Sequence, residues 1–468
     1  MSYSFDFKTL ARAYATRDLT PGQLVDELLR CLAARGDDKV WLHRATEAEL
    51  RQQARDLEAR RARGEALPLY GLPFGVKDNI DVAGWPTSAG CAAFAYVPTR
   101  SAAVVEKLQA AGALLVGKQN MDQFATGLVG VRTTTGHCAN AIDARVVPGG
   151  SSSGSAVAVA AGVVSFSIGS DTGGSGRVPG ALNNVVGLKP TPGAASTRGF
   201  LYCNRSFDVP PVFALTVDDA YAVLQQIVGP DDEDPYTSQH LPTEPTAWQP
   251  GALPARWRFA VPAAPHLDFF GDDAQRRAWE RTLDVLTALG GEREEIDFAP
   301  FLEAGRLVFG GPLIAERWLT YGRTVEQHPG AVHPAVKQAL LASRDYSAAD
   351  TFGALYRLRT LQREVGRRLR DTLLVTPTVG RIPTVAEVDA EPMLANSRMG
   401  HYTYFANPLR LAAVSVPAGW RDDGLPFGLQ IVGPSFSERP IGALARAVQQ
   451  RLGGRLGASG HRLGNIPT

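Results

Sequence analysis

The sequence predicts an α/β protein built on one large and mostly buried sheet. Short apolar segments, such as residues 72–76 and 113–117, alternate with segments that have the apolar spacing of helices. Their apolar residues follow one another without alternation, which is typical of strands covered on both faces. A chain of 468 residues is also longer than a single core usually grows. We therefore expect a mixed or parallel sheet, in one large domain with insertions or in two domains.

The first part of the chain is predicted to be helical. Thr20 and Pro21 fit the N-cap and the first position of a helix, and apolar residues follow on one helical face. A second helix is expected from about residue 46 to 64, with its many charges on a solvated face. We expect residues 1–66 to form an N-terminal helical segment that covers the core or a partner subunit.

The rest of the chain continues the α/β pattern. Further strands are expected at about 256–261, 373–378, 413–419 and 425–433, and further helices at about 102–111, 273–289, 348–370 and 438–452. We expect residues 67–468 to form the main domain, with its core in residues 67–228 and 373–452 and a substrate-side insertion at about 255–372.

Composition argues against several classes of protein. The 48 basic and 47 acidic residues give a net charge of +1, so there is no electrostatic basis for binding nucleic acid or an anionic membrane. The sequence has no apolar run long enough for a transmembrane helix and no signal-peptide pattern, which favours a cytoplasmic protein. Its four cysteines are scattered and form no zinc motif or disulfide framework. We expect neither a metal nor a cofactor.

The segment from residue 149 to 190 carries the strongest functional signal. A Gly/Ser turn leads into a helix of small apolar residues, an apolar strand follows, and the strand ends at an Asp-Thr-Gly-Gly-Ser sequence. Gly173 and Gly174 allow a turn that aims successive N–H groups at one point. Ser175 follows at once. A hydroxyl beside converging N–H donors is what acyl transfer requires, namely a nucleophile next to an oxyanion hole.

The residues alone leave other interpretations of this segment open. The composition of residues 149–154 is typical of a flexible linker, and the same turn fits the G-x-S-x-G nucleophile elbow, although a poor strand precedes it. The Asp-Thr-Gly before Ser175 occurs in aspartic proteases, but those need a second carboxylate and no second Asp-Thr-Gly is present. This reasoning does not choose among Ser151, Ser152 and Ser153 as a partner for the nucleophile.

Three separated blocks together resemble the amidase signature family, whose members use a Ser-Ser-Lys triad. The blocks are the Gly-Gly-Ser-Ser turn at 149–152, the Asp-Thr-Gly-Gly-Ser that ends at Ser175, and a Gly-x-Pro-x-x-x-Lys-Asp sequence that contains Lys77. In the family the nucleophile follows the first serine of the turn by 24 residues, a spacing that here links Ser151 to Ser175. The resemblance implies the amidase signature fold, a large twisted mixed sheet covered by helices on both faces.

The resemblance also assigns a role to each member of the triad. Ser175 would be the nucleophile, Ser151 would take its proton, and Lys77 would take the proton of Ser151. As a base Lys77 has to be neutral, and burial beside hydroxyls rather than carboxylates would lower its pKa sufficiently. The bridging serine of the family follows a cis peptide bond.

The same resemblance predicts the surroundings of the triad. The oxyanion hole would be formed by the N–H groups of Thr172, Gly173, Gly174 and Ser175. The Gly-, Thr- and Asn-rich residues 121–140 are predicted to form an active-site wall. His137 lies in that loop and is left out of the predicted site, because the triad of the family has no histidine.

Within the family, several segments resemble the allophanate hydrolases. These segments are residues 175–179, 183–184, 311–317 and 396–403. Arg317 matches the arginine that binds substrate in those enzymes, and a guanidinium fork suits a carboxylate. Phe309, eight residues earlier, stands where they usually carry a tyrosine that touches the substrate. Arg317 and Phe309 are therefore the predicted substrate-binding residues.

The resemblance implies hydrolysis of allophanate (urea-1-carboxylate), with release of ammonia through an acyl-enzyme, as in urea degradation. Phe309 keeps a second possibility open, which is another small carboxylated amide or ureido compound. A third is a protein like the amidase-type component of a glutamine amidotransferase, which would need a partner protein. We expect a small-molecule substrate and a homodimer.

Overall fold

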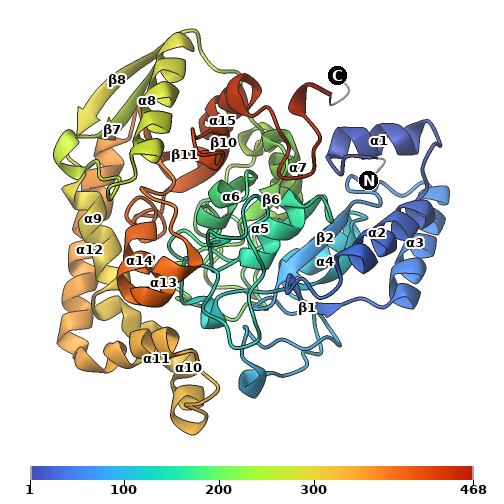
Figure 1. Cartoon of the computed structure of the whole chain (residues 1–468), viewed down its shortest axis with the longest axis horizontal. Helices are drawn as coiled ribbons and strands as arrows, with labels where there is room; N and C mark the ends of the chain where they lie inside the picture. Colours follow the sequence, from blue (N-terminus) through green and yellow to red (C-terminus); the bar gives the residue numbers. More distant parts are fainter. Residues whose placement is uncertain (1–2, 466–468) are drawn as a thin grey trace.

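The structure is built on one large mixed sheet, which confirms the predicted fold class (Figure 1). The computed structural model describes residues 3–465, and within them 11 strands form a single sheet. In chain order these are β1 (Trp41–Arg44), β2 (Pro73–Lys77), β3 (Leu114–Gln119), β4 (Phe166–Ile168), β5 (Val186–Lys189), β6 (Val212–Ala214), β7 (Trp257–Pro262), β8 (Gly291–Ile296), β9 (Leu373–Pro377), β10 (Ala412–Trp420) and β11 (Pro426–Gly433). Their spatial order is β1-β3-β2-β4-β6-β5-β10-β11-β9-β7-β8.

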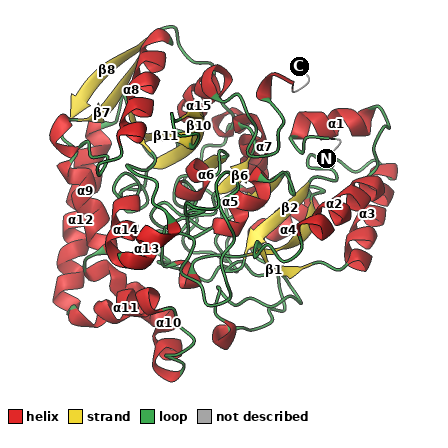
Figure 2. Cartoon of the chain, in the orientation of Figure 1, coloured by secondary structure: helices red, strands yellow, loops and turns green. Residues whose placement is uncertain are grey.

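Helices pack against both faces of this sheet (Figure 2). The helices are α1 (Phe7–Ala15), α2 (Pro21–Arg35), α3 (Glu47–Ala62), α4 (Ala103–Ala110), α5 (Ser153–Ala160), α6 (Val178–Leu182), α7 (Val217–Ile227), α8 (Asp273–Ala288), α9 (Ala299–Phe309), α10 (Glu316–Gln327), α11 (Pro334–Leu341), α12 (Ala348–Arg368), α13 (Val385–Ala390), α14 (Pro392–Met399) and α15 (Glu438–Leu452). Leu115 of β3 belongs to the same hydrophobic core as residues of α4, α7 and α15, whereas its neighbours Leu114 and Val116 belong to the core that contains residues of α2, α3 and α5. Alternate side chains of one strand thus enter two cores. None of the helices within residues 3–465 combines the length and apolarity that a membrane crossing requires.

The N-terminal segment contains the two expected helices, α2 and α3, together with a helix and a strand that we did not predict, α1 and β1. Thr20 and Thr46 cap α2 and α3, and each forms a capping box with the residue three positions later. β1 pairs antiparallel with β3 and forms one edge of the sheet. The first 66 residues are therefore not purely helical, and the domain division after residue 66 stays a prediction.

Residues 255–372 also contribute to the sheet. β7 pairs parallel with both β9 and β8, so this segment extends the sheet at its other edge. α9 and α12 lie together at that end of the molecule, and α10 and α11 project beyond them (Figure 1). Treating the segment as an insertion stays a prediction.

Two neighbouring parallel strands bring the candidate site together. β2 pairs in parallel with β4, and both are fully buried. β2 ends at Lys77, and the chain leaves β4 toward the loop that contains Ser175. Because the two strands run in the same direction, the chain leaves both of them at the same end of the sheet, where their carboxyl ends lie.

Candidate active site

The three residues predicted as a triad form one hydrogen-bonded chain. Lys77 Nζ lies 2.6 Å from Oγ of Ser151, and that oxygen lies 2.9 Å from Oγ of Ser175. The peptide bond between Gly150 and Ser151 is cis. All three side chains are buried. Because a serine hydroxyl can both donate and accept, the geometry allows a proton to pass from Ser175 through Ser151 to Lys77.

The surroundings of Lys77 suit a proton acceptor. Burial lowers the pKa of Lys77 to about 8. Within residues 3–465 no carboxylate lies in ion-pair distance of its ammonium group. Its second partner is Ser170, whose Oγ lies 2.8 Å from Nζ and also accepts a hydrogen bond of 3.1 Å from the side-chain amide of Asn79. Sequence reasoning missed Ser170, although it directly precedes the Asp-Thr-Gly-Gly-Ser motif.

A buried ion pair holds the loop that carries Ser175. The guanidinium of Arg177 donates two hydrogen bonds to the carboxylate of Asp171, at 3.0 Å from Nε and 2.9 Å from Nη2. The same carboxylate accepts from the N–H groups of Gly174 at 2.8 Å and Gly176 at 2.9 Å. Asn407 adds a hydrogen bond from its side chain to the carbonyl of Asp171, 2.6 Å long. The loop and the C-terminal part of the chain are thereby fixed to each other.

These hydrogen bonds reduce the number of N–H groups that are free to form the predicted oxyanion hole. Because Gly174 donates its N–H to Asp171, it has no free donor for a substrate oxygen. The N–H groups of Thr172, Gly173 and Ser175 donate no hydrogen bond to any residue from 3 to 465. Of the four N–H groups predicted to form the oxyanion hole, these three are free among the described residues, and their role as donors stays a prediction.

Arg317 lies at the site and is held by Asn204. Its Nε donates a 2.9 Å hydrogen bond to Oδ1 of Asn204, while its buried Nη2 has no partner within the described residues. Asp208 fixes this part of the loop, because its carboxylate accepts from the N–H groups of Cys203 at 2.7 Å and Asn204 at 3.2 Å. It also accepts from the hydroxyl of Thr172, and burial raises its pKa to about 6. Asn204 and Asp208 were not predicted as site residues.

Phe309 lines the same site from the end of α9. Its ring stacks on that of Tyr404 with centroids 4.1 Å apart, and the guanidinium carbon of Arg317 lies 5.2 Å from its centroid. A Cβ atom on Gly173 would overlap both aromatic rings. The aromatic pair therefore packs directly against the backbone of the candidate oxyanion hole.

A small cavity of about 60 Å³ lies between these groups. Its walls include Thr172, Gly173, Ser175, Phe309, Arg317, Arg132 and Tyr404. Residues 125–128 and Arg132 belong to the predicted active-site wall, whereas His137 of that wall is exposed. Within the described residues no cluster of His, Cys, Asp and Glu has the arrangement of a metal site.

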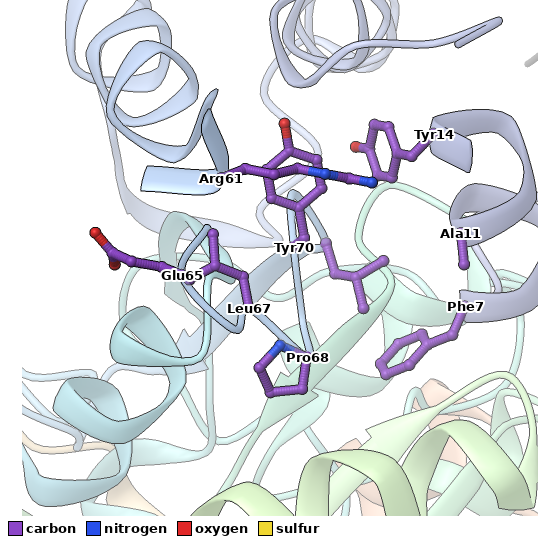
Figure 3. A pocket seen from close by; sticks show the side chains of 9 residues that line it. Phe7, Ala11, Tyr14, Arg61, Glu65, Leu67, Pro68 and Tyr70 are labelled. Carbon is purple, nitrogen blue, oxygen red and sulfur yellow. The ribbon is translucent and has the colours of Figure 1, made fainter. Parts of the chain in front are cut away.

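A larger cavity, of about 270 Å³, lies at the opposite end of β2 (Figure 3). Arg61 extends over the ring of Tyr70 there, with its guanidinium carbon 4.3 Å from the ring centroid. Tyr14 donates its hydroxyl hydrogen to the carbonyl of Gly71 at 3.1 Å. None of the predicted site residues lines this cavity, so the candidate active site is the smaller one.

Fold and site together define an enzyme class. The amidase family model matches residues 24–441, and the chain belongs to the amidase family. The protein is thus a member of the amidase family, and it is similar to proteins named urea amidolyase and allophanate hydrolase.

Individual relatives agree with this placement. The urea amidolyase of Saccharomyces cerevisiae is 38% identical over 434 residues, which is 92% of this chain but only 23% of the yeast protein. The solved structure of Kluyveromyces lactis allophanate hydrolase has a TM-score of 0.89 and 35% identity, over 96% of this chain and 74% of that one. A glutamyl-tRNA(Gln) amidotransferase subunit from Deinococcus radiodurans is 33% identical over 484 aligned positions, 94% of this chain and 96% of that protein. The chain thus spans about a quarter of the urea amidolyases that it matches.

Proposed function

We propose that this protein hydrolyses a small carboxylated amide through an acyl-enzyme on Ser175, and that allophanate is its substrate. The observation that carries the proposal is the buried hydrogen-bonded chain from Lys77 through Ser151 to Ser175. Lys77 Nζ lies 2.6 Å from Oγ of Ser151, which lies 2.9 Å from Oγ of Ser175. A hydroxyl at the end of such a chain can lose its proton as it attacks a carbonyl carbon.

The proposed reaction has two halves. In the first, Ser175 attacks the amide carbonyl, Ser151 takes its proton and passes its own to Lys77, and the oxyanion forms beside the free N–H groups of residues 172, 173 and 175. The proton returns through Ser151 to the leaving nitrogen, so ammonia departs and an ester on Ser175 remains. In the second half, water attacks that ester by the same relay, and the acid and free Ser175 are released.

Arg317 supports a carboxylated substrate. It is buried beside Ser175, it forms no ion pair with any residue from 3 to 465, and Nη2 keeps a free donor. A buried guanidinium without a counter-ion favours an anionic ligand. Proteins named allophanate hydrolase and urea amidolyase among the relatives point to allophanate, whose carboxylate and amide lie at opposite ends of one small molecule.

The direct test measures ammonia release from allophanate by the purified protein. We expect turnover by the wild-type enzyme and loss of nearly all activity in Ser175→Ala. Ser153→Ala is the matched control, because it removes a buried hydroxyl from the same region that donates to the carbonyl of Asn120 at 3.4 Å and has no hydrogen bond to the triad among residues 3–465. Full activity of Ser175→Ala would disprove the nucleophile. An active triad that does not turn over allophanate would shift the substrate to another carboxylated amide or ureido compound.

The role of Arg317 has its own measurement. Arg317→Ala should lower kcat/KM for allophanate by about 100-fold and leave a neutral amide within about threefold, because only the anionic substrate loses its partner. Equal losses on both substrates would show that Arg317 supports the fold of the site and does not bind the substrate.

A second candidate function follows from the amidotransferase subunits. The chain matches 96% of the length of the Deinococcus radiodurans protein, at 33% identity. In that case glutaminase activity would be low for the isolated chain and would rise when the partner proteins are added.

We also propose a cytoplasmic homodimer, which sedimentation of the purified protein and fractionation of cells would test.

A further inference from the structure

We propose that Arg132 is a second specificity-determining cation of the active-site cavity, and that it acts with Arg317 to select amides that carry an anionic group. This inference rests on the proposed function and extends it, because sequence reasoning assigned substrate charge to Arg317 alone. Both arginines line the cavity that contains Ser175, and 2% of Arg132 and 4% of Arg317 are exposed.

The guanidinium of Arg132 forms no ion pair with a carboxylate of residues 3–465, although Asp122 lies nearby. Its Nη1 donates to the carbonyl of Thr126 at 3.2 Å, and its Nη2 to the carbonyl of Pro392 at 2.7 Å. Nη2 also lies 3.7 Å from the sulfur of Met393. All of these acceptors are uncharged, and the buried Nε has no partner among residues 3–465.

The nearest carboxylate does not serve as a counter-ion either. Asp122 directs its oxygens to the N–H groups of Gly130 at 3.0 Å and of Arg132 itself at 2.8 Å, and it forms no ion pair with the guanidinium. In the part of the chain that the structure describes, no Asp or Glu lines the cavity. Two buried guanidinium groups therefore share one small space that these acidic side chains do not reach. A buried charge without a partner is costly, and a bound anion would remove that cost.

The hydrogen bonds of Arg132 also explain how it is oriented. The two backbone carbonyls hold its terminal nitrogens from two separate segments, the loop at residue 126 and the start of α14. A Cβ atom on Gly127, which lines the cavity, would lie 2.9 Å from Cδ of Arg132, the carbon that carries Nε. Arg132 is thus held in place beside the cavity that it lines, where its charge can act on a bound anion.

The kinetic test compares malonamate, an anionic amide, with propionamide, a neutral amide of similar size. For Arg132→Met we expect kcat/KM for malonamate to fall by about 10-fold or more, and that for propionamide to change by less than about threefold. Arg306→Met is the control, because Arg306 is exposed and lies outside the cavity. Equal losses on both amides, or no loss on either, would overturn the proposal.

A binding measurement separates this proposal from the proposed function. Malonate, the dianion of the corresponding acid, is titrated calorimetrically into the wild type, Arg132→Met and Arg132→Lys, which requires no turnover. We expect malonate to bind at least 10-fold more weakly to Arg132→Met and about threefold more weakly to Arg132→Lys, which keeps the charge. Unchanged binding in both variants would overturn the role of Arg132 even if the enzyme is active.

The binding measurement also remains informative if the wild-type enzyme proves to be inactive. If the wild type hydrolyses no amide and Ser175 is not labelled by a fluorophosphonate, the proposed function fails, while weaker malonate binding in the variants would still support a two-arginine anion site. If Arg132→Met does not fold, Arg132→Gln takes its place, and wild-type malonate affinity in that neutral variant would contradict the proposal.

Discussion

Lys77 Nζ lies 2.6 Å from Oγ of Ser151, although 74 positions separate the two residues. The contact arises because β2 ends at Lys77 and the turn before α5 places Ser151 over that end. No ion pair holds the ammonium group within residues 3–465, and both of its side-chain partners are hydroxyls. The lysine is therefore kept in an environment that favours its neutral form.

The pH profile of the enzyme follows from this environment. Burial lowers the pKa of Lys77 to about 8, and only the neutral amine accepts a proton. We expect kcat/KM to rise with pH, to reach half of its maximum near pH 8, and to level off above it. Below pH 8 the lysine is protonated and the rate should fall about 10-fold per pH unit. A profile whose only limb lies near pH 6, where Asp208 titrates, would contradict Lys77 as the base.

Ser170 and Ser151 both contact Lys77, but they should differ in their effect on rate. Ser151 lies between lysine and nucleophile, so Ser151→Ala should lower kcat about 1,000-fold. Ser170→Ala removes one hydrogen bond from the lysine and one from Asn79, and it should lower kcat about fivefold to 10-fold. Steady-state kinetics with Ser153→Ala as the control would measure both. Equal losses in the two variants would show that the relay does not pass through Ser151 alone.

The ion pair of Asp171 and Arg177 is predicted to be important for stability as well as activity. Both side chains are fully buried, so Arg177→Met leaves an unpaired carboxylate and should lower the free energy of unfolding by about 3–5 kcal/mol. The pair of Asp143 and Arg145 is the control, because 84% of the Arg145 side chain is exposed. Arg145→Met should cost less than about 1 kcal/mol. Urea unfolding measures both values, and similar losses would refute the importance of burial.

Gly173→Ala should disturb the candidate oxyanion hole without touching the triad. The added methyl group would overlap the rings of Phe309 and Tyr404, so either the loop or the aromatic pair has to move. We expect kcat to fall about 100-fold while Ser175 remains reactive toward a small fluorophosphonate. The double variant Gly173→Ala/Phe309→Ala relieves part of the overlap and should recover part of the rate. A double variant no faster than the single one would argue against the steric cause.

Several buried strands could be predicted from the sequence, whereas the two edge strands could not. β2, β3, β9, β10 and β11 are apolar segments bounded by turn residues, and each was expected within a few positions. β8 has the sequence Gly-Glu-Arg-Glu-Glu-Ile with exposed charged side chains, and β1 is a short segment that is only half-buried. Their strand conformation depends on the neighbouring strand to which they pair at the sheet edge.

The residues that surround the triad could not be predicted from the sequence either. Ser170, Asn204, Asp208 and Arg132 occur in no spacing that distinguishes them from ordinary polar loop residues. Their positions depend on contacts across long stretches of chain, such as the 113 positions between Asn204 and Arg317. One sequence therefore cannot assign them.

The sequence by itself determined the fold class and proposed Lys77, Ser151, Ser175, Arg317 and Phe309 as site residues. It could do so because buried strands and glycine-rich turns have local signals, and because three separated motifs keep a fixed order and spacing. Only the tertiary structure decided which N–H groups of the loop remain free and which arginines share the cavity. Hydrogen bonding and burial depend on groups that meet only after folding, so that Gly174 donates to Asp171 and Arg132 lies in the same cavity as Arg317.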